Sequence, residues 1–245
     1  MQVEIFDDYP AVSERAAAIV AEQIRQKPTS VIGFATGSTP VLMYEILVQM
    51  HRNQNLDFSE IISFNLDEYV GIPAEHAQSY HTFMWEHLFR HINITPTRIH
   101  IPDGMVKDLR ACCADYEDAI ARCGGIDLQI LGIGSNGHIA FNEPGSTHGS
   151  RTRVMDLTEK TIADNARFFD RPEDVPRRAI TMGIGTILEA RQVLLTGCGE
   201  HKAGAVAAAL EKDVTTAMPA SALQHHDGAL ILLDRAAASQ LRQAW

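Results

Sequence analysis

Two adjacent carboxylic acids, Asp67 and Glu68, follow directly after an apolar run in the segment FNLDEYVG (residues 64–71). Successive side chains of a strand point in different directions, so one acid can enter a crevice while the other stays in water. A carboxylate in a partly dry crevice has a raised pKa and can act as a base near neutral pH. A solvated acidic turn, the commoner meaning of this spacing, remains open at this point.

A glycine-rich loop, LGIGSNGHIAFNEPGS (residues 131–146), carries a second group of polar side chains. It contains Gly132-x-Gly134-x-x-Gly137, the pattern of a dinucleotide-binding turn, which requires a full helix directly after the glycines. Pro144 and Gly145 follow too soon for such a helix, so the pattern is weak evidence for a nucleotide. Side chains that donate, accept and titrate suit proton transfer to a sugar or carbonyl compound, and the loop offers Asn136, His138, Asn142 and Glu143.

The segment GFATGSTP (residues 33–40) has the features of a turn between a strand and a helix. Gly37 and Ser38 allow a tight turn, Thr39 is a good N-cap, and Pro40 suits the first helical position. Backbone N–H groups at the positive end of a helix dipole form a ready anion site. A turn that binds nothing fits the segment equally well.

Two basic residues, Arg167 and Lys202, could contact a phosphate. Arg167 lies in a polar stretch (residues 158–178), and Lys202 begins a predicted helix after the residues GCG. From the sequence alone, ordinary surface charge is the favoured interpretation of both. We predict that the polar stretch belongs to a mobile lid around residues 153–182.

We expect neither a metal nor another cofactor. Adjacent histidines diverge, so we interpret the tripeptide His225-His226-Asp227 as a solvated loop. The cysteines show no C-x-x-C spacing, and free, mostly buried thiols are typical of a reducing compartment. They are Cys112, Cys113, Cys123 and Cys198.

The composition is that of a folded enzyme of 245 residues, with 45% hydrophobic and 21% charged residues. The net charge of −10 disfavours attraction to nucleic acid or an anionic membrane, but allows a local basic pocket for one small phosphate. The first residues do not resemble a signal peptide, and no apolar run is long enough to span a bilayer. We therefore expect a cytoplasmic protein with a small-molecule partner, while the oligomeric state, monomer or homo-oligomer, stays open.

Strand-like and helical patterns alternate along the chain, which predicts an α/β fold: one domain (residues 1–245) with a doubly wound, mainly parallel sheet and helices on both faces. Such Rossmann-like sheets bind ligands outside the carboxyl ends of their strands. The predicted strands are residues 3–6, 31–35, 61–65, 127–133, 192–196 and 229–234. The predicted helices include residues 10–25, 80–89, 108–122, 202–211 and 235–242.

Taken together and in this order, these segments resemble the short form of the glucosamine-6-phosphate deaminase (glucosamine-6-phosphate isomerase) family. The resemblance runs from about residue 3 to residue 235, and FNLDEYVG and GHIAFNEPG are long enough to make chance implausible. Gluconolactonases are related by fold, but we do not expect this pair of motifs in them. The matching stretches are ATGSTP, FNLDEYVG, SYHTFM, LGIGSNGHIAFNEPGS, SRTRV, NARFFD, TMGIGTIL and GEHKAGAV.

The resemblance implies conversion of glucosamine 6-phosphate and water to fructose 6-phosphate and ammonia, in amino-sugar catabolism, without a metal or redox cofactor. It implies that Asp67 is the enolisation base, that His138 opens the sugar ring, and that Glu143 orients His138. It further implies a substrate phosphate site formed by Thr36, Gly37, Ser38 and Thr39, with Arg167 and Lys202 supplying positive charge.

The chain departs from the family pattern at positions that bear on catalysis and regulation. Asn136 stands where some members carry an aspartate, so a direct carboxylate–histidine relay through this position is absent, although the amide can still hold the geometry. Met155 stands where regulated long members lead us to expect a lysine, while Arg151 and Arg153 remain. The C-terminal extension of those members is also missing, and we expect hyperbolic kinetics without activation by N-acetylglucosamine 6-phosphate.

Two other functions fit the same pattern. One is a deaminase for another amino-sugar phosphate such as galactosamine 6-phosphate, because epimer selectivity depends on details of the pocket. The other is a non-catalytic sugar-phosphate sensor, which would keep residues 36–39 and Lys202 but would not need Asp67 and His138. The presence of both favours an enzyme.

Overall fold

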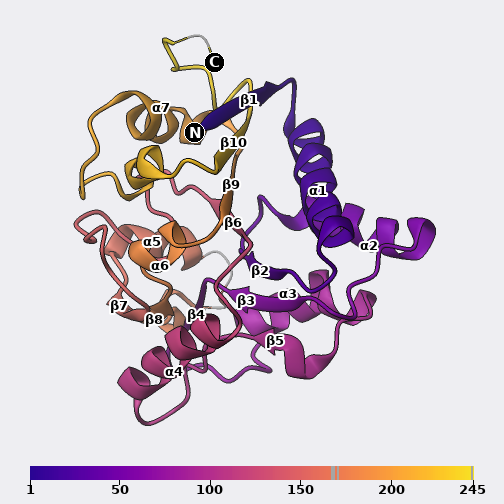
Figure 1. The fold of residues 1–245 in the computed structure, drawn as a ribbon. Coiled ribbons are helices and arrows are strands. Elements are labelled where there is room, and N and C mark those ends of the chain that lie inside the picture. Colours follow the sequence, from indigo (N-terminus) through magenta and orange to yellow (C-terminus); the bar gives the residue numbers. More distant parts are fainter. Residues whose placement is uncertain (167–168, 170, 244) are drawn as a thin grey trace.

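Seven strands lie side by side and parallel in the computed structural model, which describes residues 1–166, 169, 171–243 and 245 (Figure 1). Their order in the sheet is β1-β10-β9-β6-β2-β3-β5. The strands are β1 (Gln2–Phe6), β2 (Val31–Phe34), β3 (Ile62–Asn65), β5 (Ile99–His100), β6 (Leu128–Gly132), β9 (Gln192–Gly197) and β10 (Ala229–Asp234). The predicted strands are confirmed within a residue or two at each end.

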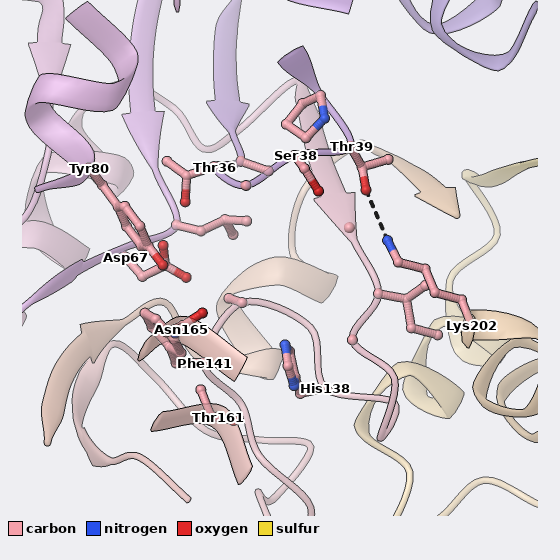
Figure 2. Close-up of a pocket in the computed structure, with 18 residues that line it drawn as sticks. Thr36, Ser38, Thr39, Asp67, Tyr80, His138, Phe141, Thr161, Asn165 and Lys202 are labelled. Atoms are coloured by element: carbon pink, nitrogen blue, oxygen red, sulfur yellow. Dashed lines mark hydrogen bonds between the residues drawn. The ribbon is translucent and has the colours of Figure 1, made fainter. Parts of the chain in front are cut away.

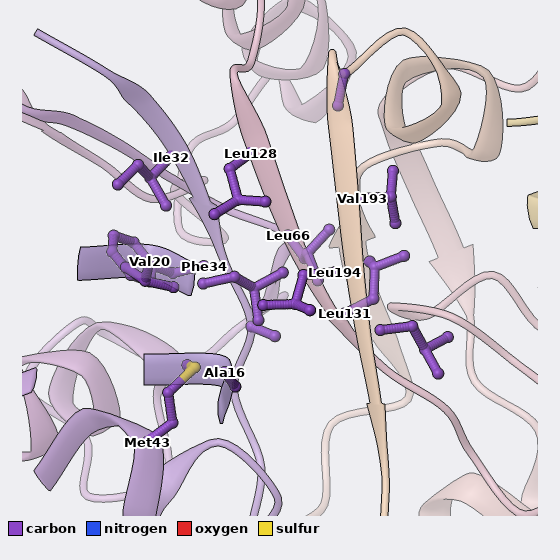
Figure 3. Close-up of a cluster of buried hydrophobic side chains, with 14 of the residues drawn as sticks. Ala16, Val20, Ile32, Phe34, Met43, Leu66, Leu128, Leu131, Val193 and Leu194 are labelled. Atoms are coloured by element: carbon purple, nitrogen blue, oxygen red, sulfur yellow. The ribbon is translucent and has the colours of Figure 1, made fainter. Parts of the chain in front are cut away.

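Apolar sequence explains why these segments pair in the middle of the molecule. Every residue of β2 is buried, as are the first four of β6, and strands covered on both faces read as continuous apolar runs. Helix α1 (Tyr9–Gln26) begins where the Asp8 carboxylate accepts a hydrogen bond from the Ala11 N–H, and it buries one apolar stripe. Figure 3 shows Ala16 and Val20 of this stripe beside Ile32 and Phe34 of β2.

Helices cover both faces of the sheet, which confirms the doubly wound prediction (Figure 1). Helix α2 (Val41–Gln54) packs beside α1 on one face, and α7 (Ala203–Glu211) lies on the other. The further helices are α3 (Tyr80–His87), α4 (Leu109–Arg122), α5 (Glu159–Asn165) and α6 (Ile184–Leu188). In the part of the chain that the structure describes, no helix is both long enough and apolar enough to cross a membrane.

A second, three-stranded antiparallel sheet was not predicted from the sequence. It contains β4 (Asp67–Tyr69), β7 (Arg153–Asp156) and β8 (Arg178–Thr181), in the order β4-β8-β7. Thr181 pairs with both Asp67 and Arg153. Residues 153–182, which we predict to be a lid, therefore include the paired strands β7 and β8, with α5 between them in sequence. Of these two strands, β8 also pairs with β4, the strand that carries Asp67.

Two local predictions are wrong. Residues 235–242, expected to be a helix, form turns over 235–240 and irregular structure after them. The Asp234 carboxylate accepts from the Ala237 N–H, and the Ser239 hydroxyl donates to the carbonyl of Ala236. Short polar side chains of this kind compete with helical hydrogen bonding. The tripeptide at 225–227 is not wholly solvated, because His226 is buried with its Nε2 atom 2.7 Å from the Ala190 carbonyl oxygen.

The cysteines are free, as predicted, but less buried than expected. Cys113 is buried, and the other three are half-buried.

The sheet has its topological switch point at β2. The chain passes from β2 to β3 and β5 on one side, and β6, β9 and β10 follow on the other. Ligands in such sheets bind in the crevice outside the carboxyl ends of the strands at this point. The segments that follow β2, β3, β6 and β9 meet there, and they carry all three predicted motifs and Lys202.

Candidate active site

A cavity of about 220 Å³ lies at the switch point, and the predicted motifs line it (Figure 2). Figure 2 shows Thr39 and Lys202 at one end of the cavity, Asp67 and Tyr80 at the other, and His138 on the loop between them. The predicted site residues that line it are Thr36, Gly37, Ser38, Thr39, Asp67, His138 and Lys202. Two others, Asn136 and Glu143, lie behind His138, and Arg167 falls outside the described residues.

The segment after β2 forms one end of the cavity. Gly37 has a φ of +104°, a conformation that favours glycine. Helix α2 begins at Val41 with Pro40 in the capping position, so the prediction that Thr39 is the N-cap is wrong. The Thr39 hydroxyl instead accepts a hydrogen bond of 2.9 Å from the Lys202 Nζ. A hydroxyl and an ammonium group thus stand together beside a glycine turn, an arrangement suited to phosphate.

Lys202 is a half-buried basic residue. Burial lowers its pKa, since removal from water disfavours the charged form. Its ammonium group donates a hydrogen bond to the neutral hydroxyl of Thr39, so a phosphate group at this end of the cavity would supply the opposite charge.

Asp67 is a buried carboxylate at the other end. Leu66 separates it from the end of β3, and it is 5% exposed. Burial raises its pKa well above the ordinary range, and the negative charge of Glu68 raises it further. Such a carboxyl group can take and return a proton near neutral pH, which is what an enolisation base must do.

Glu68, the second acid of the pair, is a structural residue. Its carboxylate accepts hydrogen bonds from the N–H groups of Tyr69, Tyr80 and His81. Two of these groups belong to the first turn of α3, where backbone donors have no helical partner. Glu68 therefore fixes the start of α3, and with it the Tyr80 ring beside Asp67. The interpretation of the pair as a solvated acidic turn is wrong, because both acids are buried.

His138 is held by an amide that is held in turn by a carboxylate. The Asn136 Oδ1 lies 2.7 Å from the His138 Nδ1, and the Asn136 Nδ2 donates a 3.0 Å hydrogen bond to the Glu143 Oε2. The direct distance between the His138 Nδ1 and the Glu143 Oε2 is 3.9 Å. Asn136 therefore connects Glu143 to His138 by hydrogen bonds.

A glycine of this loop makes room for the His138 imidazole. A Cβ atom on Gly134 would lie 2.2 Å from the Cε1 of His138, so only glycine leaves room for the imidazole. Gly137 has a φ of +85°, which also favours glycine. No helix follows these residues directly, and the weak nucleotide interpretation gains no support.

Several site residues were missed by sequence reasoning because they arrive from distant segments. Thr161 of α5 donates its hydroxyl hydrogen to the Glu143 Oε1, and it lines the cavity. Asn165 also lines the cavity and donates a 2.9 Å hydrogen bond to the Tyr69 hydroxyl. The rings of Tyr80 and Phe141 stack at 5.9 Å with a 9° angle between their planes. Tyr80, Phe141 and Asn165 lie in the motifs SYHTFM, GHIAFNEPG and NARFFD, but the motifs gave no role to these side chains. Thr161 lies in none of the motifs.

Metal ligation finds no support in the geometry. Within residues 1–166, 169, 171–243 and 245, no group of three or more His, Cys, Asp or Glu side chains is placed to hold a metal ion.

A glycine turn beside an ammonium group, a buried carboxylate and a held imidazole meet at the switch point of a doubly wound sheet, which is typical of an α/β enzyme. The model of the glucosamine-6-phosphate isomerases/6-phosphogluconolactonase family matches residues 9–232. The chain belongs to this family.

Curated relatives match the chain over nearly its whole length. A glucosamine-6-phosphate deaminase of Halothermothrix orenii is 52% identical over 241 residues, which cover 98% of this chain and 100% of the relative. One of Rhodopirellula baltica is 54% identical over 241 residues, covering 98% of this chain and 96% of the relative.

Solved structures agree with the fold. A monomeric glucosamine-6-phosphate deaminase, 44% identical, superimposes with a TM-score of 0.96 and covers 98% of this chain and 100% of its own. The 6-phosphogluconolactonase of Trypanosoma cruzi reaches a TM-score of 0.80 at 21% identity, covering 99% of this chain and 97% of its own, which shows the shared fold alone.

Proposed function

We propose that the protein is a glucosamine-6-phosphate deaminase, which converts glucosamine 6-phosphate and water to fructose 6-phosphate and ammonia. One observation carries the proposal: Asp67 and His138 line the same cavity as residues 36–39 and Lys202. In a hexose 6-phosphate the phosphate group and the reacting carbons C1 and C2 stand at opposite ends. The cavity has an anion-binding end and a buried carboxylate at the opposite end (Figure 2). The relatives' names support the same activity.

Phosphate binding orients the substrate. The N–H groups after β2, the Thr39 hydroxyl and the Lys202 ammonium group would hold the phosphate, and we retain Arg167 as a further contact. These interactions give the reacting end of the sugar one position relative to Asp67, which makes proton transfer effectively unimolecular.

His138 opens the pyranose ring in this proposal. The imidazole moves a proton from the anomeric hydroxyl to the ring oxygen, which breaks the bond between C1 and the ring oxygen and leaves an aldehyde at C1. Asn136 and Glu143 hold the imidazole in the orientation that this transfer requires.

Asp67 then carries out the isomerisation. Its carboxylate takes the C2 proton, the C1 oxygen gains a proton, and an enolamine results. Return of a proton to C1 gives the imine at C2, and water adds to that carbon and displaces ammonia to leave the ketone of fructose 6-phosphate. No electrons are gained or lost overall, because C1 is reduced as C2 is oxidised.

The decisive experiment measures ammonia release in a coupled assay. We expect turnover with glucosamine 6-phosphate and none with unphosphorylated glucosamine at the same concentration. Galactosamine 6-phosphate, assayed in parallel, ranks the two epimers and tests the alternative substrate. Binding of glucosamine 6-phosphate without ammonia release would contradict the proposal and identify a sensor.

A lactonase arm covers the other activity in the family's name. In this control, hydrolysis of 6-phosphogluconolactone is measured from the acid that it releases. We expect its rate to equal that of the uncatalysed reaction.

A further inference from the structure

The one carboxylate that acts on the half-buried Lys202 in the part of the chain that the structure describes is not on its own segment. Lys202 follows β9 in a short turn, and its neighbours Glu200 and His201 are exposed. The charged or titratable groups that act on its ammonium group from packed segments are Cys198, at the end of β9, and Asp234, at the end of β10. Thr39, which accepts its hydrogen bond, is neutral.

Asp234 is itself buried, with an exposed fraction of 7%. Its Oδ1 and Oδ2 atoms lie 3.1 and 2.9 Å from the Gly199 nitrogen, which donates to the carboxylate. Oδ1 also accepts a 2.7 Å hydrogen bond from the Ala237 N–H. The carboxylate therefore joins the end of β10 to the turn that follows β9.

This turn determines where Lys202 points. Gly199 has a φ of +90°, and its carbonyl oxygen accepts a 3.1 Å hydrogen bond from the Lys202 N–H. The Asp234 carboxylate holds the nitrogen of Gly199, and the carbonyl of Gly199 holds the nitrogen of Lys202. An uninterrupted chain of hydrogen bonds thus leads from β10 to the backbone of the residue that faces the phosphate end of the cavity.

We propose that Asp234 is a positioning residue of the phosphate site, because its carboxylate holds the Gly199 turn that aims Lys202. The proposal rests on the function proposed above and adds a residue that does not line the cavity.

The charges support this assignment. Burial lowers the pKa of Lys202, whereas Cys198 and Asp234 act to raise it. Burial also raises the pKa of the Cys198 thiol to about 11, so at neutral pH the thiol carries no charge. Of the two groups, Asp234 is therefore the one whose negative charge can stabilise the ammonium form.

The matched test uses Asp234→Asn, which retains an oxygen acceptor for Gly199 and Ala237 and removes the charge. The control is Asp7→Asn, which removes the same charge from an exposed carboxylate that pairs with Arg235 at 2.6 Å. KM and kcat for glucosamine 6-phosphate are measured from pH 6 to pH 9, together with the inhibition constant of inorganic phosphate.

We expect Asp234→Asn to raise KM and the phosphate inhibition constant about tenfold at pH 7.5, with kcat at saturation within about twofold of the wild-type value. The rise in KM should grow with pH, because Lys202 loses its proton at a lower pH without the carboxylate. In the double variant with Lys202→Arg the growth with pH should disappear, since arginine stays charged. Unchanged KM at every pH, or equal effects of Asp7→Asn, would overturn the proposal.

A second variant and a second measurement test the proposal if Asp234→Asn fails to fold or if the protein shows no turnover. If Asp234→Asn does not fold, Asp234→Glu replaces it: the charge is kept on a longer side chain, and the proposal then requires a raised KM with an unaltered pH dependence. Inorganic phosphate binding, measured by calorimetry, does not depend on turnover. An inactive wild-type protein whose phosphate binding weakens in Asp234→Asn would contradict the deaminase function and still support the role of Asp234.

Discussion

The Nδ1 atom of His138 lies 2.7 Å from the Oδ1 atom of Asn136. The amide is not free to turn over, because its Nδ2 donates to the Glu143 carboxylate, which cannot act as a donor when ionised. The Asn136 oxygen therefore faces His138 and requires a hydrogen on Nδ1. In the neutral imidazole, Nε2 then carries no hydrogen and can accept a proton from the substrate. An amide thus sets the tautomer that an aspartate would otherwise set.

Replacing Asn136 tests this relay. Asn136→Leu keeps the size but removes three side-chain hydrogen bonds, those with the His138 N–H, the His138 Nδ1 and the Glu143 carboxylate, so the imidazole loses its fixed tautomer and orientation. We expect kcat to fall about a hundredfold, within the range that general acid–base groups contribute. Steady-state ammonia release measures the change.

The matched control for this variant is Asn53→Leu, since Asn53 is exposed on α2. A kcat of Asn136→Leu within twofold of the control would show that the relay has no part in catalysis.

Much of the fold could be predicted because its central strands are local features. The run VIGF (31–34) is apolar throughout and is followed by turn residues, so its burial and its ends are both readable. The small sheet is different: β4 has three residues and β8 four, and they pair across about a hundred residues of sequence, as Asp67 with Thr181. Nothing local signals such a pairing, because cross-strand contacts decide the structure of short strands.

The site likewise has a part that the sequence predicts and a part that depends on contacts between distant segments. The side chains after β2, β3, β6 and β9 could be predicted to meet, since carboxyl ends of parallel strands share one edge. The contact between Thr161 and Glu143, and that between Asn165 and Tyr69 96 residues away, depend on where α5 packs. The positioning role of Asp234 also needed coordinates, because it acts through the backbone of Gly199.

Asp67→Asn should abolish turnover while leaving sugar-phosphate binding largely intact. The amide has the same size but cannot abstract a proton from carbon. In the wild-type enzyme, kcat/KM should fall as the pH drops through the raised pKa of Asp67, because only the ionised carboxyl group acts as a base. Rates between pH 5 and pH 9 check the profile, and near-wild-type ammonia release by the variant would exclude Asp67 as the base.

The same substitution should stabilise the fold at neutral pH. A carboxyl group whose pKa is raised by folding binds its proton more tightly in the folded state, so stability decreases as the pH rises from its unfolded pKa to its folded pKa. Asp67→Asn removes this decrease in stability, because the amide does not ionise. We expect a melting temperature about 2–4 °C higher at pH 7, the shift that about 1 kcal/mol produces in a chain of this size, and little difference at pH 4. A lower melting temperature at pH 7 would contradict the electrostatic argument.

Lys202→Ala should raise KM much more than it lowers kcat. Loss of a charge-assisted hydrogen bond costs about 1.5–3 kcal/mol of binding, which corresponds to about a tenfold to hundredfold higher KM. Initial rates with glucosamine 6-phosphate measure both constants, and Lys212→Ala, at the exposed end of α7, is the control. An unchanged KM would place Lys202 outside the phosphate site.

The last prediction concerns regulation: we expect hyperbolic kinetics and no activation by N-acetylglucosamine 6-phosphate. An effector activates only if it binds one of two states better, and for a sugar phosphate this requires cations that are available to it. Arg153 instead donates to the Asn142 Oδ1 at 2.9 Å and to the Ser146 hydroxyl at 3.1 Å, and Arg151 pairs with the carboxylates of Glu117 and Glu189.

Met155 lies two residues after Arg153 on the same strand, β7. Its side chain is uncharged, so this position adds no cation to the site. Initial rates are measured against substrate concentration with and without saturating N-acetylglucosamine 6-phosphate, for the wild-type chain and for Met155→Lys, which adds a cation beside Arg153. We expect superimposable hyperbolas for the wild-type chain. A sigmoidal curve that the acetylated sugar converts to a hyperbola would contradict the prediction, because it would mean that the two arginines exchange their protein partners for the effector.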